Sequence, residues 1–212
     1  MKKIQRINVI DIESTCWPDQ ISPGGEEQRK VAEIIEIGIV QVNVKTLKIE
    51  NKQSYLVKPV DYPILSQYCI DLTGITNKLL EEEGTTLEYA IARMMSEFKT
   101  MKYEFSSWGD YDRSQFEREC ERKNIQYPFH KTHLNLKYLL SSLVGSKVQR
   151  NVDGFLDFLH MPFEGDPHRG VDDAYNVAKM YIKIMKYINS CILSIVDINV
   201  GGDEYHRKNI QA

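Results

Sequence analysis

The chain has 212 residues, of which 42% are hydrophobic and 27% are charged, and its net charge is −3. This is the composition of one well-packed globular domain. It excludes a protein that binds nucleic acid through overall basic charge, although a site built from carboxylates lowers the net charge and can coexist with a basic groove.

The four cysteines are scattered and include no C-x-x-C pair, so a zinc site and a disulfide framework are not expected. This usage predicts a reducing, cytoplasmic location. The N-terminus does not resemble a signal peptide, and no stretch approaches the roughly 20 apolar residues of a membrane span.

The first predicted element is a buried strand at 3–12, which ends in Asp11 and Glu13. Side chains alternate along a strand, so these two carboxylates should project from the same face. Neighbouring carboxylates resist joint ionisation unless a cation lies between them. The alternative is an ordinary strand end that runs into a polar loop.

Two more strands are predicted after a polar, turn-rich loop at 16–30. The strand at 33–42 is apolar on both faces, which is typical of a strand covered by helices. The strand at 47–57 follows a short turn at residues 45–46, so the three strands should form an antiparallel meander.

The middle of the chain is predicted to be irregular at 59–75, where Pro59 and Pro63 occur. A helix is expected to begin at Thr85, because Thr85 and Glu88 have capping-box spacing. Its apolar residues recur at helical intervals: Leu87, Ala90, Ile91, Met94, Met95 and Phe98. The next predicted elements are a strand at 103–108 and helices at 113–123, 136–143 and 152–160.

A long helix is predicted after residues 167–170, and the apolar segment 191–200 is interpreted as a late strand. Residues 201–212 are expected to form a polar, loose tail. Together these elements predict a single α/β domain over residues 1–200, with a mixed sheet flanked by helices. Ligands on such sheets gather at strand ends.

Asp112 follows the predicted strand at 103–108 and is a candidate to join Asp11 at that edge. It can also be a helix N-cap, since Asp112 and Gln115 have the spacing of a cap and its reciprocal partner. The two roles are compatible. Asp110 is an alternative acid in the same loop.

His168 and Asp173 form a second candidate pair. Pro167 and Gly170 should keep His168 off the following helix, whereas Asp173 falls in its first turn, where the helix dipole favours negative charge. The two side chains can then approach one point from different directions. A surface histidine is the alternative for His168, and Asp172 competes with Asp173.

Four carboxylates and one histidine from three segments suit phosphoryl chemistry. Oxygen ligands favour Mg²⁺ or Mn²⁺ over zinc. Two such ions about 4 Å apart recur in displacement at phosphorus. A histidine with a pKa near neutrality can take a proton from the attacking water.

The order D-x-E, D and H-x4-D resembles the DEDDh 3′→5′ exonucleases, the DnaQ-like branch of the RNase H-like superfamily. The likeness runs from about residue 5 to residue 190 and is strongest to the branch that holds the 3′ histone mRNA exonuclease and bacterial KapD. The segments that carry it are 11–16, 33–38, 57–59, 65–66, 72–75 and 164–178.

This resemblance implies an RNase H-like five-stranded sheet and a role for each of five residues. Asp11, Glu13 and Asp173 would hold one of two Mg²⁺ or Mn²⁺ ions. Asp11 would bridge to the second ion, with Asp112 supporting that ion directly or through water. His168 would be the general base.

The family pattern also selects between neighbouring acids. The last acid stands five residues after the histidine, which favours Asp173 over Asp172. The Asp-x-Ser-x-Phe pattern favours Asp112 over Asp110, although the stretch before it is longer than in the histone mRNA enzyme.

Substrate contacts are expected from five further residues. Ser14 and Thr15 would contact the terminal sugar, and Ile75 would wedge against the last base. Trp108 or Tyr111 would stack on that base, because aromatic stacking tolerates any base. The alternative for both aromatic residues is packing within the scaffold.

The resemblance therefore predicts a metal-dependent 3′→5′ exonuclease that acts on a single-stranded 3′ end, RNA more than DNA, and releases nucleoside 5′-monophosphates. The alternatives are a proofreading DNA exonuclease and a non-catalytic nucleic-acid-binding module with a vestigial site. No protein partner, membrane partner or oligomeric state is predicted.

Overall fold

The computed structural model describes residues 4–18 and 25–209. Within these residues five strands form one mixed sheet, in the order β3-β2-β1-β4-β5. Their bounds are β1 Arg6–Ser14, β2 Ile34–Asn43, β3 Lys48–Leu56, β4 Glu104–Ser107 and β5 His133–Asn135. The first three are antiparallel neighbours, whereas β4 runs parallel to β1 and β5. The predicted α/β domain with its antiparallel meander is confirmed.

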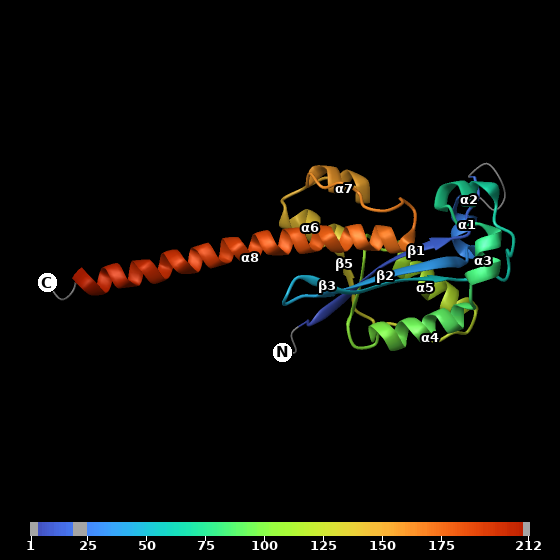
Figure 1. The fold of residues 1–212 in the computed structure, drawn as a ribbon, viewed down its shortest axis with the longest axis horizontal. Coiled ribbons are helices and arrows are strands. Elements are labelled where there is room, and N and C mark those ends of the chain that lie inside the picture. Colours follow the sequence, from blue (N-terminus) through green and yellow to red (C-terminus); the bar gives the residue numbers. More distant parts are fainter. Residues whose placement is uncertain (1–3, 19–24, 210–212) are drawn as a thin grey trace.

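Helices cover both faces of the sheet (Figure 1). One face carries α4 and α5, the other carries α6, α7 and α8, and the short helices α1, α2 and α3 lie at the end toward which β1 runs. The bounds are α1 Gly25–Val31, α2 Gln67–Thr73, α3 Asn77–Glu83, α4 Leu87–Phe98, α5 Tyr111–Arg122, α6 Leu136–Leu143, α7 Val152–Phe158 and α8 Gly170–Asn209.

Strand β1 is buried on both faces and divides two hydrophobic cores. Ile10 and Ile12 pack with residues of α4 and α5, and Val9 packs with residues of α6, α7 and α8. Each fully buried side chain of this size stabilises the fold by about 1.5–3 kcal/mol. Because side chains alternate, Asp11 and Glu13 share the α8 face with Val9.

The start of α8 lies directly on the backbone of β1 and β2. A Cβ atom on Gly38 would lie 2.0 Å from the backbone carbon of Gly170, and one on Gly170 would lie 2.7 Å from the carbonyl oxygen of Asp11. Gly38 is the register partner of Asp11. Two residues without side chains therefore bring the first turn of α8 against the end of β1.

The segments predicted to be loops contain helices. Within the predicted loop at 16–30 the structure has α1, and residues 19–24 lie outside the described residues. The segment at 59–75 includes α2, which Ser66 caps, and α3 follows directly with Thr76 as its cap. Helices of seven residues are too short for a clear period in the sequence. Helix α4 begins at Leu87, two residues after the predicted start, and its cap is Thr86 and not Thr85.

The prediction of a strand at 191–200 is wrong, and the fifth strand lies elsewhere in the chain. It is β5, three residues that pair in parallel with β4. Residues 191–200 instead continue α8, which extends to Asn209 and leaves the domain (Figure 1). No Gly or Pro interrupts residues 171–200, so each added residue satisfies its own backbone within the helix, whereas a strand needs a neighbour.

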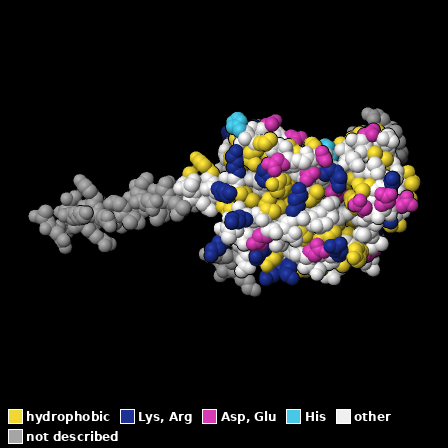
Figure 2. All heavy atoms as spheres, viewed as in Figure 1, with side chains coloured by type: hydrophobic (Ala, Val, Ile, Leu, Met, Phe, Trp, Pro, Cys, Tyr) yellow, Lys and Arg dark blue, Asp and Glu magenta, His cyan; other side chains and the backbone are white. Residues whose placement is uncertain are grey.

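The predicted loose tail is likewise helical as far as Asn209. In the part of the chain that the structure describes, no helix has the length and apolar character needed to cross a membrane. On the face seen in Figure 2, Lys and Arg side chains lie interspersed with Asp and Glu side chains and form no continuous basic band.

Replacing Gly38 by alanine should destabilise the fold, because the new methyl group would occupy the space of the Gly170 backbone. We expect a loss of about 3 kcal/mol or more in the free energy of unfolding, measured by urea denaturation. The comparison is Gly74→Ala. The added Cβ has no atom within 4 Å there, although the backbone has a φ of 69°. That change should lose only about 1–2 kcal/mol. An equal or smaller loss for Gly38→Ala would contradict the close packing.

Candidate active site

The site begins where β1 runs past its neighbour β4. The two strands pair only from Ile7 to Val9, so the later part of β1 has one edge free of β4. Helix α5 fills this place, and the Asp112 carboxylate accepts the backbone N–H of Ile12 at 3.1 Å. Asp112 is buried beside the strand that carries Asp11 and Glu13.

Asp173 joins this edge from the first turn of α8. Oxygen atoms of Asp11, Glu13 and Asp173 lie within 4.8 Å of one another, and we refer to these three residues as the carboxylate cluster. Asp173 Oδ2 is buried and has no hydrogen-bond partner among the described residues. Such an unsatisfied oxygen is costly to bury unless a ligand completes it.

Burial raises the pKa of all four acids at this edge, and nearby carboxylates add to this effect for Asp11, Glu13 and Asp173. Burial is the largest cause for each, and it raises the pKa of Glu13 to about 9, of Asp173 to about 7 and of Asp112 to about 6. The pKa of Asp11 is also well above its usual value, through burial and the nearby charges of Asp112, Glu13 and Asp173. The residues fit a divalent cation, because a hard cation bound by these oxygens would remove the repulsion.

The structure separates the neighbouring acids that the sequence left in competition. Asp172 pairs with Lys52 at 3.0 Å and accepts the backbone N–H of Asp166, so its charge is used structurally. Asp110 accepts the side chain of Asn135 at 2.9 Å and lies outside the cluster. Asp110 is also the N-cap residue of α5, so the N-cap role considered for Asp112 is wrong.

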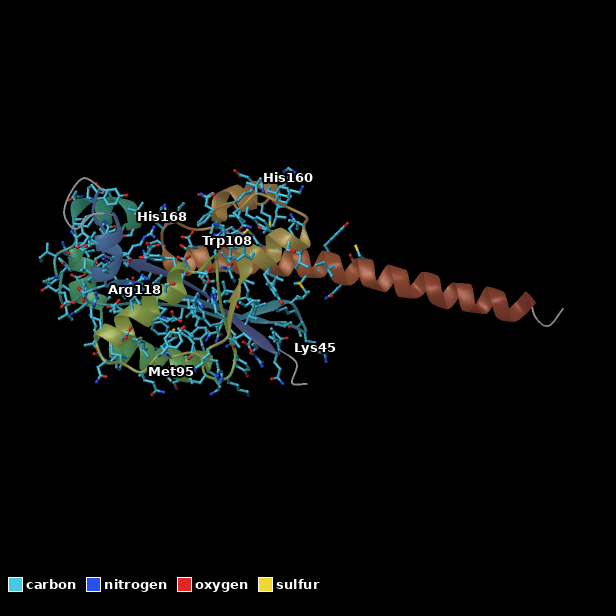
Figure 3. All side chains as sticks on the ribbon, turned by 180° about the vertical axis from the view of Figure 1, so that it is seen from behind. Lys45, Met95, Trp108, Arg118, His160 and His168 are labelled. Atoms are coloured by element: carbon cyan, nitrogen blue, oxygen red, sulfur yellow. The ribbon has the colours of Figure 1, made fainter. Side chains whose placement is uncertain are left out.

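His168 lies two residues before the first residue of α8 and five residues before Asp173 of the cluster (Figure 3). Its side chain is exposed, and its backbone has a left-handed φ of 61°. Hydrogen bonds restrain the turn that carries His168: Arg169 N–H donates to the Asp166 carbonyl, and Asp166 N–H donates to the Asp172 carboxylate. His168 therefore stands off the helix, as predicted, on a restrained turn.

Two of the expected substrate residues form one pair. The Ser14 hydroxyl and the Tyr111 hydroxyl are 2.7 Å apart, directly beyond Glu13 on β1. Tyr111 remains 42% exposed, so its ring is open to a ligand.

The other three have structural contacts instead. Thr15 is buried and its hydroxyl accepts the Glu33 N–H, and Trp108 donates its indole N–H to the Arg150 carbonyl while its ring contacts Phe155 edge-on at 5.0 Å. Ile75 has no exposed surface and packs in a core with Cys69. This placement gives Ile75 no surface with which to wedge against a base.

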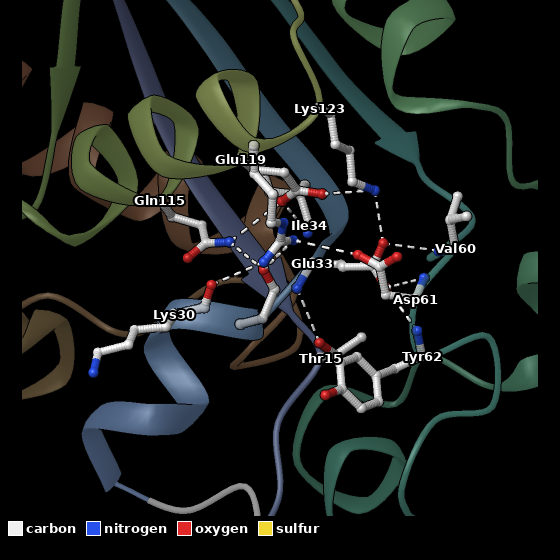
Figure 4. A network of polar contacts seen from close by, with 12 residues as sticks. Thr15, Lys30, Glu33, Ile34, Val60, Asp61, Tyr62, Gln115, Glu119 and Lys123 are labelled. Carbon is white, nitrogen blue, oxygen red and sulfur yellow. Dashed lines mark hydrogen bonds and ion pairs between the residues drawn. The ribbon is translucent and has the colours of Figure 1, made fainter.

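A buried acid that was not singled out from the sequence supports the end of β1 (Figure 4). The Glu33 carboxylate accepts the backbone N–H groups of Val60, Asp61 and Tyr62 and pairs with Lys123. Although burial opposes it, the bond from Lys123 and the backbone bonds hold the pKa of Glu33 below its usual value. The Glu33 carbonyl also accepts the Thr15 N–H, and the Glu33 N–H donates to the Thr15 hydroxyl, so Glu33 fixes the chain just beyond the cluster.

Glu36 is a second such acid, and it lies opposite Glu13 in the register of β1 and β2. Its carboxylate is fully buried and accepts bonds from Ser54, Arg169 and Gly170. A charged residue within the apolar run at 33–42 was the signal in the sequence, since a strand covered on both faces rarely holds a charge without partners.

Comparison with known proteins gives one family. The family model for the exonuclease domain RNase_T matches residues 9–181. The 3′-5′ exonuclease Snipper of Drosophila melanogaster is 32% identical over 208 residues, which cover 88% of this chain and 71% of that protein. The human 3′-5′ exoribonuclease 1 is 31% identical over 197 residues, covering 89% of this chain but 54% of that protein, so the chain spans about half of it.

Solved structures agree with this result. The nuclease domain of 3′hExo, a DEDDh family member bound to rAMP, superposes with a TM-score of 0.75 and 28% identity, covering 86% of this chain and 92% of that one. A 3′-exonuclease solved with a histone mRNA stem-loop has a TM-score of 0.75 and 27% identity, covering 88% of this chain and 84% of that one.

The raised pKa values predict how stability depends on pH. The folded protein keeps protons that an unfolded glutamate releases near pH 4.5, so the metal-free protein should lose stability as the pH rises toward 9. Glu13→Gln removes one of the repelling charges. We expect it to raise the free energy of unfolding by about 1–3 kcal/mol at pH 8 in EDTA, since one pKa unit corresponds to about 1.4 kcal/mol and relaxation recovers part of the shift.

Thermal denaturation in EDTA at pH 5 and pH 8 measures this effect. Asp172→Asn is the matched control, because Asp172 is paired with Lys52 and should give no gain. Adding Mn²⁺ should stabilise the unaltered protein and not Glu13→Gln. A Glu13→Gln protein less stable than the unaltered one at pH 8 would contradict the predicted repulsion.

Proposed function

Because the chain belongs to the RNase T exonuclease family, we propose that it is a metal-dependent 3′→5′ exonuclease that removes nucleotides from single-stranded RNA. The observation that carries the proposal is the carboxylate cluster, three acids within 4.8 Å of one another inside the matched residues. The family match comes from the sequence, and the convergence of the three acids comes from the packing of α8 on β1.

The proposed metal ligands divide between two ions. Asp11, Glu13 and Asp173 would hold one Mg²⁺ or Mn²⁺, and Asp11 would share a second with Asp112. The buried, unpartnered Asp173 Oδ2 and the oxygen-only donor set support this assignment. When bound, such ions lower the pKa of a coordinated water and offset the negative charge that develops on the phosphate.

The proposed reaction is hydrolysis of the last phosphodiester. His168 accepts a proton from the attacking water, whose oxygen forms a bond to phosphorus. The bond from phosphorus to the 3′ oxygen of the shortened chain breaks, and that oxygen ends as a hydroxyl. The product is a nucleoside 5′-monophosphate. The exposed imidazole of His168 supports this role, because a base in this position must reach solvent to pass its proton on.

The terminal nucleotide would be held beside Ser14 and Tyr111. Their hydroxyl pair lies just beyond Glu13, where we expect the sugar of a nucleotide whose phosphate is bound at the carboxylate cluster. The open ring of Tyr111 can stack on a base. Trp108 is the weaker candidate for stacking, since its ring and its N–H are already used by Phe155 and Arg150.

RNA is favoured over DNA by the relatives. Human 3′-5′ exoribonuclease 1 and the histone mRNA stem-loop complex carry RNA in their names. A proofreading DNA exonuclease would use the same chemistry. It would differ only in how residues outside the cluster contact the sugar and base of the substrate. A binding module with a vestigial site is disfavoured, because all five expected residues are present and three of them converge.

Asp11→Ala should abolish nuclease activity while the fold is retained. Asp11 is proposed to contact both ions, so the loss should be at least about 1,000-fold, which corresponds to several kcal/mol of transition-state stabilisation. Shortening of a 5′-labelled single-stranded RNA in Mn²⁺ measures it, and circular dichroism checks the fold. Asp110→Ala, which removes an acid outside the cluster, is the control and should remain active. Nuclease activity retained in Asp11→Ala would count decisively against the proposal.

Matched RNA and DNA oligomers should be degraded at different rates. We expect faster shortening of the RNA, with 5′-monophosphates as the released product, because the 2′-hydroxyl offers a contact that DNA lacks. Initial rates on oligomers of the same sequence, with the products separated by chromatography, measure the preference. Equal rates, or faster shortening of DNA, would favour the proofreading alternative.

A further inference from the structure

Both carboxylate oxygens of Glu36 accept hydrogen bonds, although Glu36 lies opposite Glu13 of the cluster. The Ser54 hydroxyl donates to Oε1 at 2.6 Å. The Arg169 guanidinium donates to both oxygens, at 3.1 and 3.4 Å, and the Gly170 N–H donates to Oε2 at 3.2 Å. Both oxygens are therefore satisfied without a cation, in contrast to the open oxygen of Asp173.

Two of these donors, the Arg169 guanidinium and the Gly170 N–H, belong to the turn that carries His168, whereas Ser54 lies on β3. Arg169 follows His168 directly, and Gly170 is the first residue of α8. Gly38 and Gly170 are in contact through their backbones and have no side chains that could bond the turn to β2. Glu36 supplies this attachment, from a strand that is buried in the sheet.

The backbone conformation of His168 must be stabilised by neighbouring residues. A residue with a side chain adopts a left-handed backbone only at a cost in free energy, so such a conformation persists only when its surroundings impose it. The His168 ring makes no hydrogen bond or ion pair with the described residues. Its direction is then set by the backbone of the turn, which Asp166 and Asp172 fix on one side and Glu36 fixes on the other.

We propose that Glu36 is a positioning residue, which holds the His168 imidazole in its working place through Arg169 and the Gly170 N–H. The proposal rests on the exonuclease function proposed above and adds a residue that touches neither substrate nor metal. A bidentate carboxylate–guanidinium pair suits this task, because its geometry fixes orientation as well as distance. Loss of such a supporting contact commonly reduces activity about 10–100-fold.

The kinetic experiment is a cycle of Glu36→Gln and His168→Ala. Alone, Glu36→Gln should lower kcat about 10–100-fold on single-stranded RNA at saturating Mn²⁺ and leave KM within about twofold. In the His168→Ala background the same change should have little further effect, since there is no imidazole left to position. Equal losses in both backgrounds would overturn the proposal, because Glu36 would then act through the fold or the cluster.

A second measurement does not depend on activity. Amide hydrogen exchange of residues 168–170 should be faster in Glu36→Gln than in the unaltered protein, whereas the exchange of β1 and the thermal midpoint should change little. Unchanged exchange at these residues would overturn the proposal even if the unaltered protein proved inactive. Inactivity of the unaltered protein would instead refute the proposed function, so the two failures are distinguishable.

Arg93→Met is the matched control. Arg93 pairs with Glu97 and lines the same 540 Å³ pocket as Arg169, but it is anchored to α4. It should keep full kcat, whereas Arg169→Met should lose activity as Glu36→Gln does, and Arg169→Lys should recover part of it. Equal losses for Arg93→Met and Arg169→Met would show that any charge in this pocket matters, which would also overturn the proposal.

Discussion

The contact between Gly38 and Gly170 is the constraint on which the site depends. A helix normally stands about 10 Å from a sheet because side chains separate them. Here the first turn of α8 approaches so closely that a Cβ on Gly38 would lie 2.0 Å from the backbone of Gly170. This approach places Asp173 among the side chains of β1, where its oxygens lie within 4.8 Å of those of Asp11 and Glu13. The carboxylate cluster is thus a consequence of backbone packing, and any side chain at either glycine would move one of its members.

Glu33 and Glu13 represent two groups among the buried acids, which differ in their donors. Glu33 accepts three backbone N–H groups and a lysine, and these donors keep its pKa below the usual value despite burial. Glu13 has acids for neighbours, and burial with their repulsion raises its pKa to about 9. The first group stabilises the ionised form within the protein itself. The second leaves charge that only an external cation can balance, and this difference separates structural acids from those suited to bind metal.

Chemistry and recognition come from different parts of the site. In the proposed reaction the cluster would contact only phosphate and metal, which RNA and DNA share. Residues that could distinguish the two substrates would lie around the Ser14 and Tyr111 hydroxyl pair, beyond the end of β1. The network of Glu33 fixes the chain at this point through Thr15, so the strand keeps its course past the last paired residue (Figure 4). Trp108 was expected to contact the base, but its ring packs against Phe155 of α7 and so has a structural contact.

The sequence by itself determined the strands of the meander, the presence of the longer helices and the acids that were expected to bind metal. Period and motif are local, so Asp11 and Glu13 on one strand face, and His168 ahead of the final helix, could be inferred without coordinates. Short elements could not: β5 has three residues and exists only because β4 lies beside it. Burial decided the rest. Ile75 and Thr15, which were expected at the substrate, are buried, whereas Glu36 was not singled out within its apolar run. The contacts of a side chain depend on segments distant in the sequence, here Glu36 with Arg169, and those are set by tertiary packing alone.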